Sequence, residues 1–375
     1  MGGNAFTDLP REAFPRLPPE LYIALKARLT ETVESLYSHV VVPREAPGKQ
    51  DYGDIDFVVC SPRSGLPAVP HTEIQEALKA HHVKAAEGNR TSNFAIPITA
   101  EYKEYLTRQG TLDIRLEDSY FCQVDINVCH DMDEWERIRF FHSYGDMGMI
   151  LGLLAQNVGL AWGLNGLKYP HPPYKPIVLS TDHKEIVDFF GLPMERWSSG
   201  FETQEEVFRW IVTSRLFDSS RFCSKGQKVK QVRTMYHNFV SWVDDRTTPE
   251  SLPVSGMSIS PSESPTPGPS GGASTFTPRQ HEVREEALLH FGKKEELEEF
   301  LCETKGRELL KKVFNGHTVS EWAQLGTRWK TVKMVMDAVR QEHGGEEGLV
   351  KIIKAEGEDG LKSRVLKASK SLEPV

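Results

Sequence analysis

A segment rich in serine, proline and glycine, residues 246–281, interrupts the chain and limits what can fold as one unit. It has few large apolar side chains, so it cannot bury enough surface to offset the entropy lost on ordering. We therefore predict a disordered linker at 246–281. Any hydrophobic core must be built separately from the longer region before the linker and the shorter region after it.

The two regions differ in their hydrophobic patterns. Before the linker, alternation of apolar and polar residues predicts strands, and apolar residues spaced by three or four predict helices. The expected strands are 38–43, 54–60, 93–98, 112–116 and 120–129, and the expected helices are 19–37, 72–82, 133–142, 146–158, 182–190 and 203–217. A sheet followed by packed helices predicts the α+β class.

The same patterns give an expected division of the chain. We expect an N-terminal helical extension at 1–37, a mixed domain at 38–245, the linker at 246–281 and a helical C-terminal domain at 282–375.

Composition narrows the class of protein further. In 375 residues, no apolar run approaches the roughly 20 residues that span a bilayer, which predicts a protein without membrane segments. The five cysteines include no CxxC pair, a pattern typical of buried thiols in a reducing compartment rather than of a disulfide framework or zinc site. We expect an intracellular protein, and the sequence leaves cytoplasm and nucleus both open.

Three aspartates on expected strands are the candidate metal-ligating residues. Asp54 and Asp56 are separated by one apolar residue, which places both carboxylates on one face of a strand. Asp125 lies between large apolar residues on a second strand. Converging carboxylates repel one another unless a cation lies between them, and hard divalent ions such as Mg²⁺ prefer oxygen ligands. The pattern alone leaves open a simpler interpretation, a solvated strand end or turn.

Several motifs then occur in an order that resembles one known family. Residues 48–56 read GKQDYGDID and resemble the GK-x-x-x-GD-x-D signature of the DNA polymerase X family, within the nucleotidyltransferase superfamily. Residues 123–126 resemble its third-carboxylate strand, and 140–146 stand in the place of its nucleotide-contacting turn. Residues 180–193 resemble a late helix of the family, so the likeness runs from His39 to Phe217.

This resemblance implies a fold, a reaction and a set of site residues. The implied fold is a nucleotidyltransferase-type mixed sheet with helices, and the implied reaction transfers a nucleotide from an NTP to a nucleic-acid 3′ end or another hydroxyl. Asp54, Asp56 and Asp125 are then the catalytic residues and the ligands of two Mg²⁺ ions, with Mn²⁺ as an alternative. The residues expected to contact the nucleotide are Arg44, Lys49, Gly53, Tyr144 and Gly145.

The chain departs from the family where the triphosphate is normally held. The superfamily uses a Gly-Ser pair whose backbone N–H groups bind phosphate, whereas residues 42–47 here read VPREAP. Proline lacks the N–H donor. Arg44 and Lys49 are the candidate replacements as phosphate binders. A catalytically inactive scaffold that binds nucleic acid or a protein partner is the alternative, and a transferase acting on a protein is a second one.

Two basic stretches suggest a polyanionic partner despite the net charge of −8. Arg221–Arg233 contains five basic residues and no acidic one, and Lys305–Lys333 contains seven basic residues against two acidic ones. We expect these stretches to contact RNA or DNA through phosphates. The alternatives are a solvated loop for the first stretch and a core role for Trp322 and Trp329 in the second.

Overall fold

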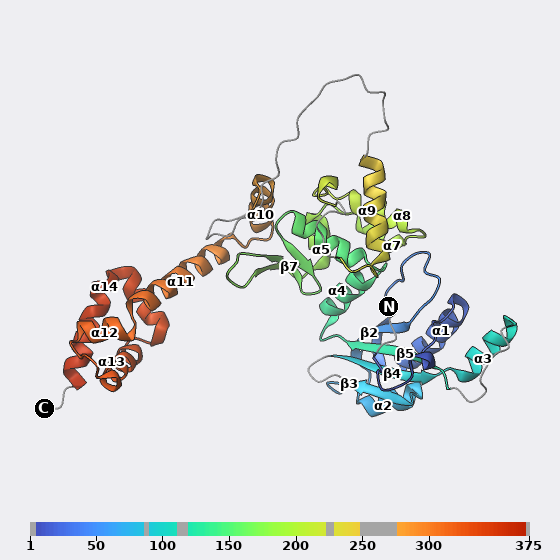
Figure 1. Ribbon diagram of the computed structural model, residues 1–375, viewed down its shortest axis with the longest axis horizontal. Helices are drawn as coiled ribbons and strands as arrows, with labels where there is room; N and C mark the ends of the chain where they lie inside the picture. Colours follow the sequence, from blue (N-terminus) through green and yellow to red (C-terminus); the bar gives the residue numbers. More distant parts are fainter. Residues whose placement is uncertain (1–4, 86–89, 111–118, 223–228, 248–275, 373–375) are drawn as a thin grey trace, which may run out of the picture. The chain divides into compact units, whose positions relative to one another are not determined.

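The computed structural model describes residues 5–85, 90–110, 119–222, 229–247 and 276–372, which belong to two compact units (Figure 1). The first unit is Met1–Ala287 and the second is Leu288–Val375. The division falls within helix α10 (Pro278–His290), not at the start of the expected domain at residue 282. The expected strand 112–116 and most of the expected linker lie outside the described residues.

A five-stranded mixed sheet forms the centre of the first unit. Its order is β1-β2-β5-β4-β3, and only β2 and β5 among these described strands run parallel. The strands are β1 (Tyr37–Val41), β2 (Asp54–Pro62), β3 (His82–Ala85), β4 (Thr91–Pro97) and β5 (Phe121–Val128). This sheet, together with the helices around it and the helical C-terminal region, confirms the expected α+β class.

Two helices cover one face of this sheet. They are α1 (Pro19–Leu36) and α2 (His71–Leu78), and their apolar side chains share one core with Ile55 and Phe57 of β2. Five residues of α1 are buried there: Leu21, Tyr22, Leu25, Leu29 and Val33. Each buried aliphatic or aromatic side chain contributes about 1.5–3 kcal/mol, so α1 is an integral part of the sheet domain. The expected extension at 1–37 therefore contains a core helix.

The opposite face of the sheet carries the aspartates of β2 and is only partly covered. Helix α4 (Met132–His142) packs over the far end of β2, where Ile138 contacts the cluster of Val58 and Cys60. The indole N–H of Trp135 donates to the carbonyl oxygen of Val58 at 3.0 Å. The start of β2, with Asp54 and Asp56, is left beyond this helix.

The rest of the first unit is helical apart from a small sheet in the order β6-β7-β8. The remaining elements are α3 (Thr99–Arg108), α5 (Met147–Asn157), β6 (Ala161–Gly163), β7 (Gly166–Tyr169), β8 (Ile177–Ser180), α6 (His183–Phe189), α7 (Met194–Ser199), α8 (Gln204–Val212) and α9 (Thr234–Thr247). Two expected helices end early. The helix expected at 72–82 ends at Leu78 because Lys79 is left-handed at φ 53°, and the one expected at 203–217 ends at Val212.

The second unit is a small helical domain with its own core. Its helices are α11 (Lys294–Val313), α12 (Gly316–Trp322), α13 (Trp329–Glu342) and α14 (Gly345–Leu372), and α14 is kinked at Gly357. Val335, Leu349 and Leu361 are fully buried in this core. Within the described residues of both units, no helix has the length and apolar character needed to cross a membrane.

Candidate metal centre

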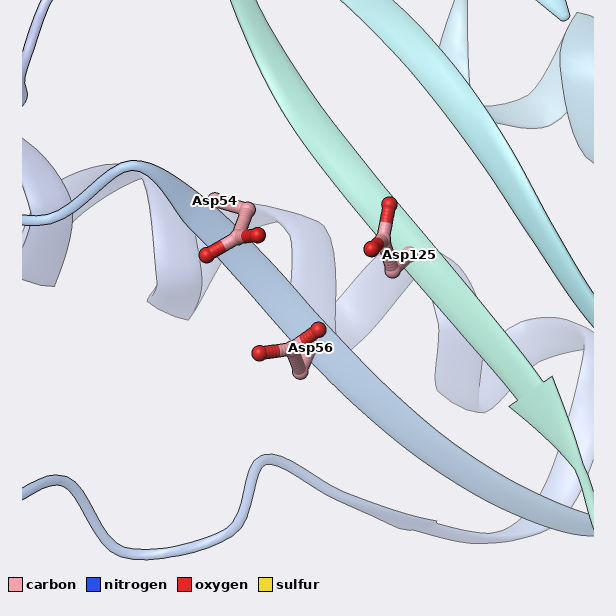
Figure 2. Close-up of side chains that lie close together, drawn as sticks. All are labelled: Asp54, Asp56 and Asp125. Carbon is pink, nitrogen blue, oxygen red and sulfur yellow. The ribbon is translucent and has the colours of Figure 1, made fainter. Parts of the chain in front are cut away.

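Asp54, Asp56 and Asp125 converge on the partly uncovered face of the sheet. Because β2 and β5 are parallel and in register, Asp56 lies directly opposite Asp125, and Asp54 lies opposite Gln123. Figure 2 shows the three side chains on the same side of the two strands. One oxygen from each carboxylate lies within 4.8 Å of the others. The triad is close enough to hold a metal ion.

The pKa values of two of these aspartates are raised, first by desolvation and then by neighbouring negative charges. Desolvation, followed by the negative charges of Asp54 and Asp125, raises the pKa of Asp56 to about 8. Desolvation and the charge of Asp54 also raise the pKa of Asp125 to about 6, against hydrogen bonds that lower it. Asp56 nevertheless has an exposed side chain, so a cation from solvent can reach it. Three hard oxygen donors that repel each other fit a divalent ion such as Mg²⁺.

Two amide side chains fix the orientation of Asp125. Asn93 of β4 and Gln123 of β5 both donate to its Oδ1 atom, at 2.7 and 2.9 Å. Gln123 is itself buried and accepts a hydrogen bond from the backbone N–H of Ala5. Neither amide was identified from the sequence. Gln123 could have been found as the polar residue two positions before Asp125, whereas Asn93 becomes a neighbour only through the β4–β5 pairing.

Three of the residues expected to contact a nucleotide meet at one turn beside α4. The backbone N–H of Arg44 donates to Ser143 Oγ at 3.2 Å, and the N–H of Tyr144 donates to the carbonyl oxygen of Arg44. Gly145 adopts φ +67°, and a Cβ there would lie 2.8 Å from Ala46 Cβ. The turn thus needs glycine, and it fixes the loop that stands in place of the Gly-Ser pair.

The guanidinium of Arg44 lies at a pocket of about 550 Å³. It donates to the hydroxyl of Tyr144 and to the carbonyl oxygen of Ser198 at 3.0 Å, and no carboxylate pairs with it among the described residues. The pocket is lined by Arg44, Glu45, Tyr144, Arg196, Ser199, Gly200, Phe201, Glu202 and Glu206. An unneutralised guanidinium at the wall of an open pocket is suited to a phosphate or carboxylate group.

Lys49 lies apart from that turn, in an ion pair that the sequence did not predict. Its Nζ atom is 2.5 Å from Oε2 of Glu45, and Oε1 of Glu45 accepts from the hydroxyl of Tyr22 at 2.6 Å. The charges of Glu45 and Lys49 both act on Asp56, raising and lowering its pKa respectively. Glu45 therefore adds a fourth negative charge that acts on the triad. The four-residue spacing of Glu45 and Lys49 was the only sequence signal for the pair.

Gly53 occupies the position directly before β2 and is buried. The preceding residue, Tyr52, exchanges two backbone hydrogen bonds with Leu17 at 2.8 and 2.9 Å. This bridge fixes the chain entering β2, and with it the position of Asp54.

The basic stretches have different surroundings in the two units. Arg221 and Arg233 pair with Asp218 and Asp146, at 3.9 and 3.0 Å, while residues 223–228 lie outside the described part of the chain. In the second unit Arg307 pairs with Glu303 at 3.4 Å. The seven basic side chains of the stretch Lys305–Lys333 are all exposed: Lys305, Arg307, Lys311, Lys312, Arg328, Lys330 and Lys333. Trp329 is 49% exposed and its ring contacts His317, whereas Trp322 packs against the core.

Comparisons with known proteins give no family for this chain. A scan against models of protein families finds no match, and a search of curated proteins finds none.

Proposed function

We propose that this protein is a divalent-metal-dependent nucleotidyltransferase of the polymerase X-like type, which transfers a nucleotide from an NTP to a hydroxyl acceptor. The convergence of Asp54, Asp56 and Asp125 within 4.8 Å, on adjacent parallel strands, carries this proposal. Three converging carboxylates raise the energy of one another, and a bound cation relieves that repulsion. Nucleotidyl transfer is proposed as the reaction because the motifs resemble the polymerase X signature and occur in the same order along the chain.

The residues present fit two Mg²⁺ ions or two Mn²⁺ ions. Asp54, Asp56 and Asp125 would hold them; when bound, the ions would supply activation of the attacking hydroxyl and charge neutralisation at the leaving pyrophosphate. Asn93 and Gln123 hold the Asp125 carboxylate in one orientation by donating to the same oxygen. Arg44 offers its guanidinium to a phosphate group at the pocket that it lines. Catalysis of this class depends mainly on positioning and charge neutralisation.

We further propose a nucleic acid as acceptor, bound in part by the second unit. Exposed lysines and arginines between Lys305 and Lys333 are suited to a phosphate backbone, and Trp329 between Arg328 and Lys330 can stack on a base. Arg221–Arg233 is less available, since both of its end residues form ion pairs. A fluorescently labelled single strand should bind with an affinity that falls steeply with salt.

A catalytically inactive scaffold of the same fold is the second candidate. It is favoured by the loop at 42–47, where proline and Glu45 stand in place of the phosphate-binding Gly-Ser pair. Incubation with Mg²⁺ and each labelled NTP, with and without RNA or DNA, separates the two candidates. A ladder of products indicates polymerisation and a single addition indicates terminal transfer. No incorporation under any combination contradicts the proposed transferase.

A further inference from the structure

Glu45 is the feature of the site that the proposed function does not explain. A carboxylate beside three aspartates adds a fourth negative charge to a centre that must bind a polyphosphate, which is itself strongly negative. Two divalent ions balance four carboxylates and leave little positive charge for the incoming phosphates. Glu45 also pairs with Lys49, which lies over the ring of Tyr52, two residues before Asp54.

The surroundings of Glu45 hold it in place. Both of its oxygens have partners, Tyr22 at 2.6 Å and Lys49 at 2.5 Å, and its side chain is 25% exposed. Tyr22 belongs to the core of α1 and its ring stacks on Tyr52 at 3.7 Å between centroids. Lys49 lies over the ring of Tyr52 at 4.7 Å. The ammonium group is thus held by a carboxylate on one side and an aromatic face on another.

We propose that Glu45 competes with substrate phosphate for Lys49: it holds the lysine in the free protein, and a bound polyphosphate must take the lysine from it. The proposal rests on the proposed function, because it takes the triad as the centre at which the polyphosphate binds. A carboxylate and a phosphate oxygen make the same kind of charge-assisted hydrogen bond to an ammonium group. When a phosphate oxygen replaces the Glu45 carboxylate at the Lys49 ammonium group, Tyr22 is the remaining partner of Glu45.

The competition gives Glu45 a defined effect on the substrate. A ligand that brings several phosphate oxygens and a divalent ion can replace the single carboxylate, whereas a monophosphate offers fewer contacts to displace it. Glu45 therefore selects polyphosphates and weakens their binding. A metal-ligand role for Glu45 predicts the opposite, since its removal would then weaken the binding of metal-bound polyphosphate.

The test measures the affinity of the full chain for inorganic tripolyphosphate in the presence of Mg²⁺. Isothermal titration calorimetry gives this affinity. Glu45→Gln keeps the side chain's shape and removes its charge, so we expect binding about tenfold tighter than in the wild type, a change of about 1.4 kcal/mol. Glu45→Ala should also bind more tightly. The matched control is Glu31→Gln, which removes an exposed carboxylate of α1 that forms no ion pair in the described part of the chain. Its affinity should stay within twofold.

A double variant identifies Lys49 as the group in competition. Lys49→Gln should bind tripolyphosphate more weakly, and Glu45→Gln should add no gain in that background. Thermal melting checks that each variant is folded. Unchanged or weaker binding by both Glu45 variants would overturn the proposal, and so would an absence of binding by every form. Tighter binding by Glu45→Gln, with no pyrophosphate released from any NTP, would support the competition and contradict nucleotidyl transfer.

Discussion

Asp56 and Asp125 lie directly opposite each other on the parallel strands β2 and β5, with their carboxylates on the same side of the sheet. The pairing brings two acids together that are far apart in the sequence, and the charge of Asp125 contributes to the raised pKa of Asp56. When both are ionised, the carboxylates of Asp56 and Asp125 therefore repel each other, and a bound divalent cation can relieve this repulsion.

Replacing Asp56 should separate activity from stability. We expect Asp56→Ala and Asp56→Asn to lower kcat at least a hundredfold, because one ligand of the catalytic ions is lost. The metal-free protein should be as stable as the wild type or more stable, since a source of repulsion is removed. Steady-state kinetics and thermal melting in EDTA measure the two effects. Substantial residual transfer would contradict the assignment of Asp56.

The raised pKa values of Asp125 and Asp56 give a pH dependence of a definite sign. Both carboxyls bind protons more tightly in the folded protein than in the unfolded chain, so folding gains stability at low pH. That gain is lost as pH rises through about 6 for Asp125 and about 8 for Asp56. After a discount for solvent exposure, Asp125 contributes about 1–2 kcal/mol.

The melting temperature of the wild type in EDTA, taken relative to that of Asp125→Asn, should therefore fall between pH 5 and pH 8.5. The comparison cancels the opposite effect of His142 and His183, whose pKa values are lowered by burial. Mg²⁺ should raise the melting temperature more at pH 8 than at pH 5, because protons compete with the metal for the same oxygens. An Asp125→Asn variant is the control, and it should lose part of the pH dependence. A metal-free stability of the wild type that rises relative to that of Asp125→Asn across this pH range would contradict the electrostatic account.

Asn93 should act through Asp125 and not on the substrate. Asn93→Ala removes one of the two hydrogen bonds that orient the carboxylate, and we expect metal affinity to fall 10- to 100-fold. Mn²⁺ binding followed by electron paramagnetic resonance measures this directly. Loss of the Asn93 hydrogen bond should also raise the pKa of Asp125, which would displace the pH profile of activity upwards. An unchanged Mn²⁺ affinity would show that Gln123 alone fixes the carboxylate.

Part of this site was predictable from the sequence and part was not. The alternation of Asp54 and Asp56 with apolar residues placed both on one face of a strand, and Ile55 and Phe57 are indeed buried on the other. The approach of Asp125 to Asp56 depends on the parallel pairing of β2 with β5, which no local pattern encodes. Asn93 became a neighbour of Asp125, and Glu45 a partner of Tyr22, only through tertiary structure.

The differences in the fold have similar physical causes. Lys79 adopts a left-handed conformation that ends α2, and β3 then begins at His82 as an edge strand that the helical pattern concealed. The helix expected as an extension proved to be α1, whose apolar face is required to cover the sheet. Amphipathic spacing predicts that a helix buries one of its faces. It does not predict which other element packs against that face.

Gly145 should be required for the turn that carries Arg44 and Tyr144. Gly145→Ala forces a side chain into a left-handed conformation and against Ala46, so we expect a loss of about 1–3 kcal/mol in the free energy of unfolding. The control is Gly110→Ala, which has a similar φ of +73° and, among the described residues, no atom within 4 Å of an added Cβ. It should cost less, because it introduces backbone strain without a clash. Equal costs for the two variants, measured by urea unfolding, would contradict the packing argument.

The central claim, that the three aspartates form a metal-dependent nucleotidyl-transfer site, is tested most directly by release of pyrophosphate. The wild type and the Asp54→Asn, Asp56→Asn and Asp125→Asn variants would each be given the four NTPs, Mg²⁺ and a single-stranded RNA or DNA acceptor. We predict Mg²⁺-dependent pyrophosphate release by the wild type with at least one NTP, and a loss of at least a hundredfold in every variant. No release by the folded wild type with any NTP, or release by the variants at the wild-type rate, would contradict the claim.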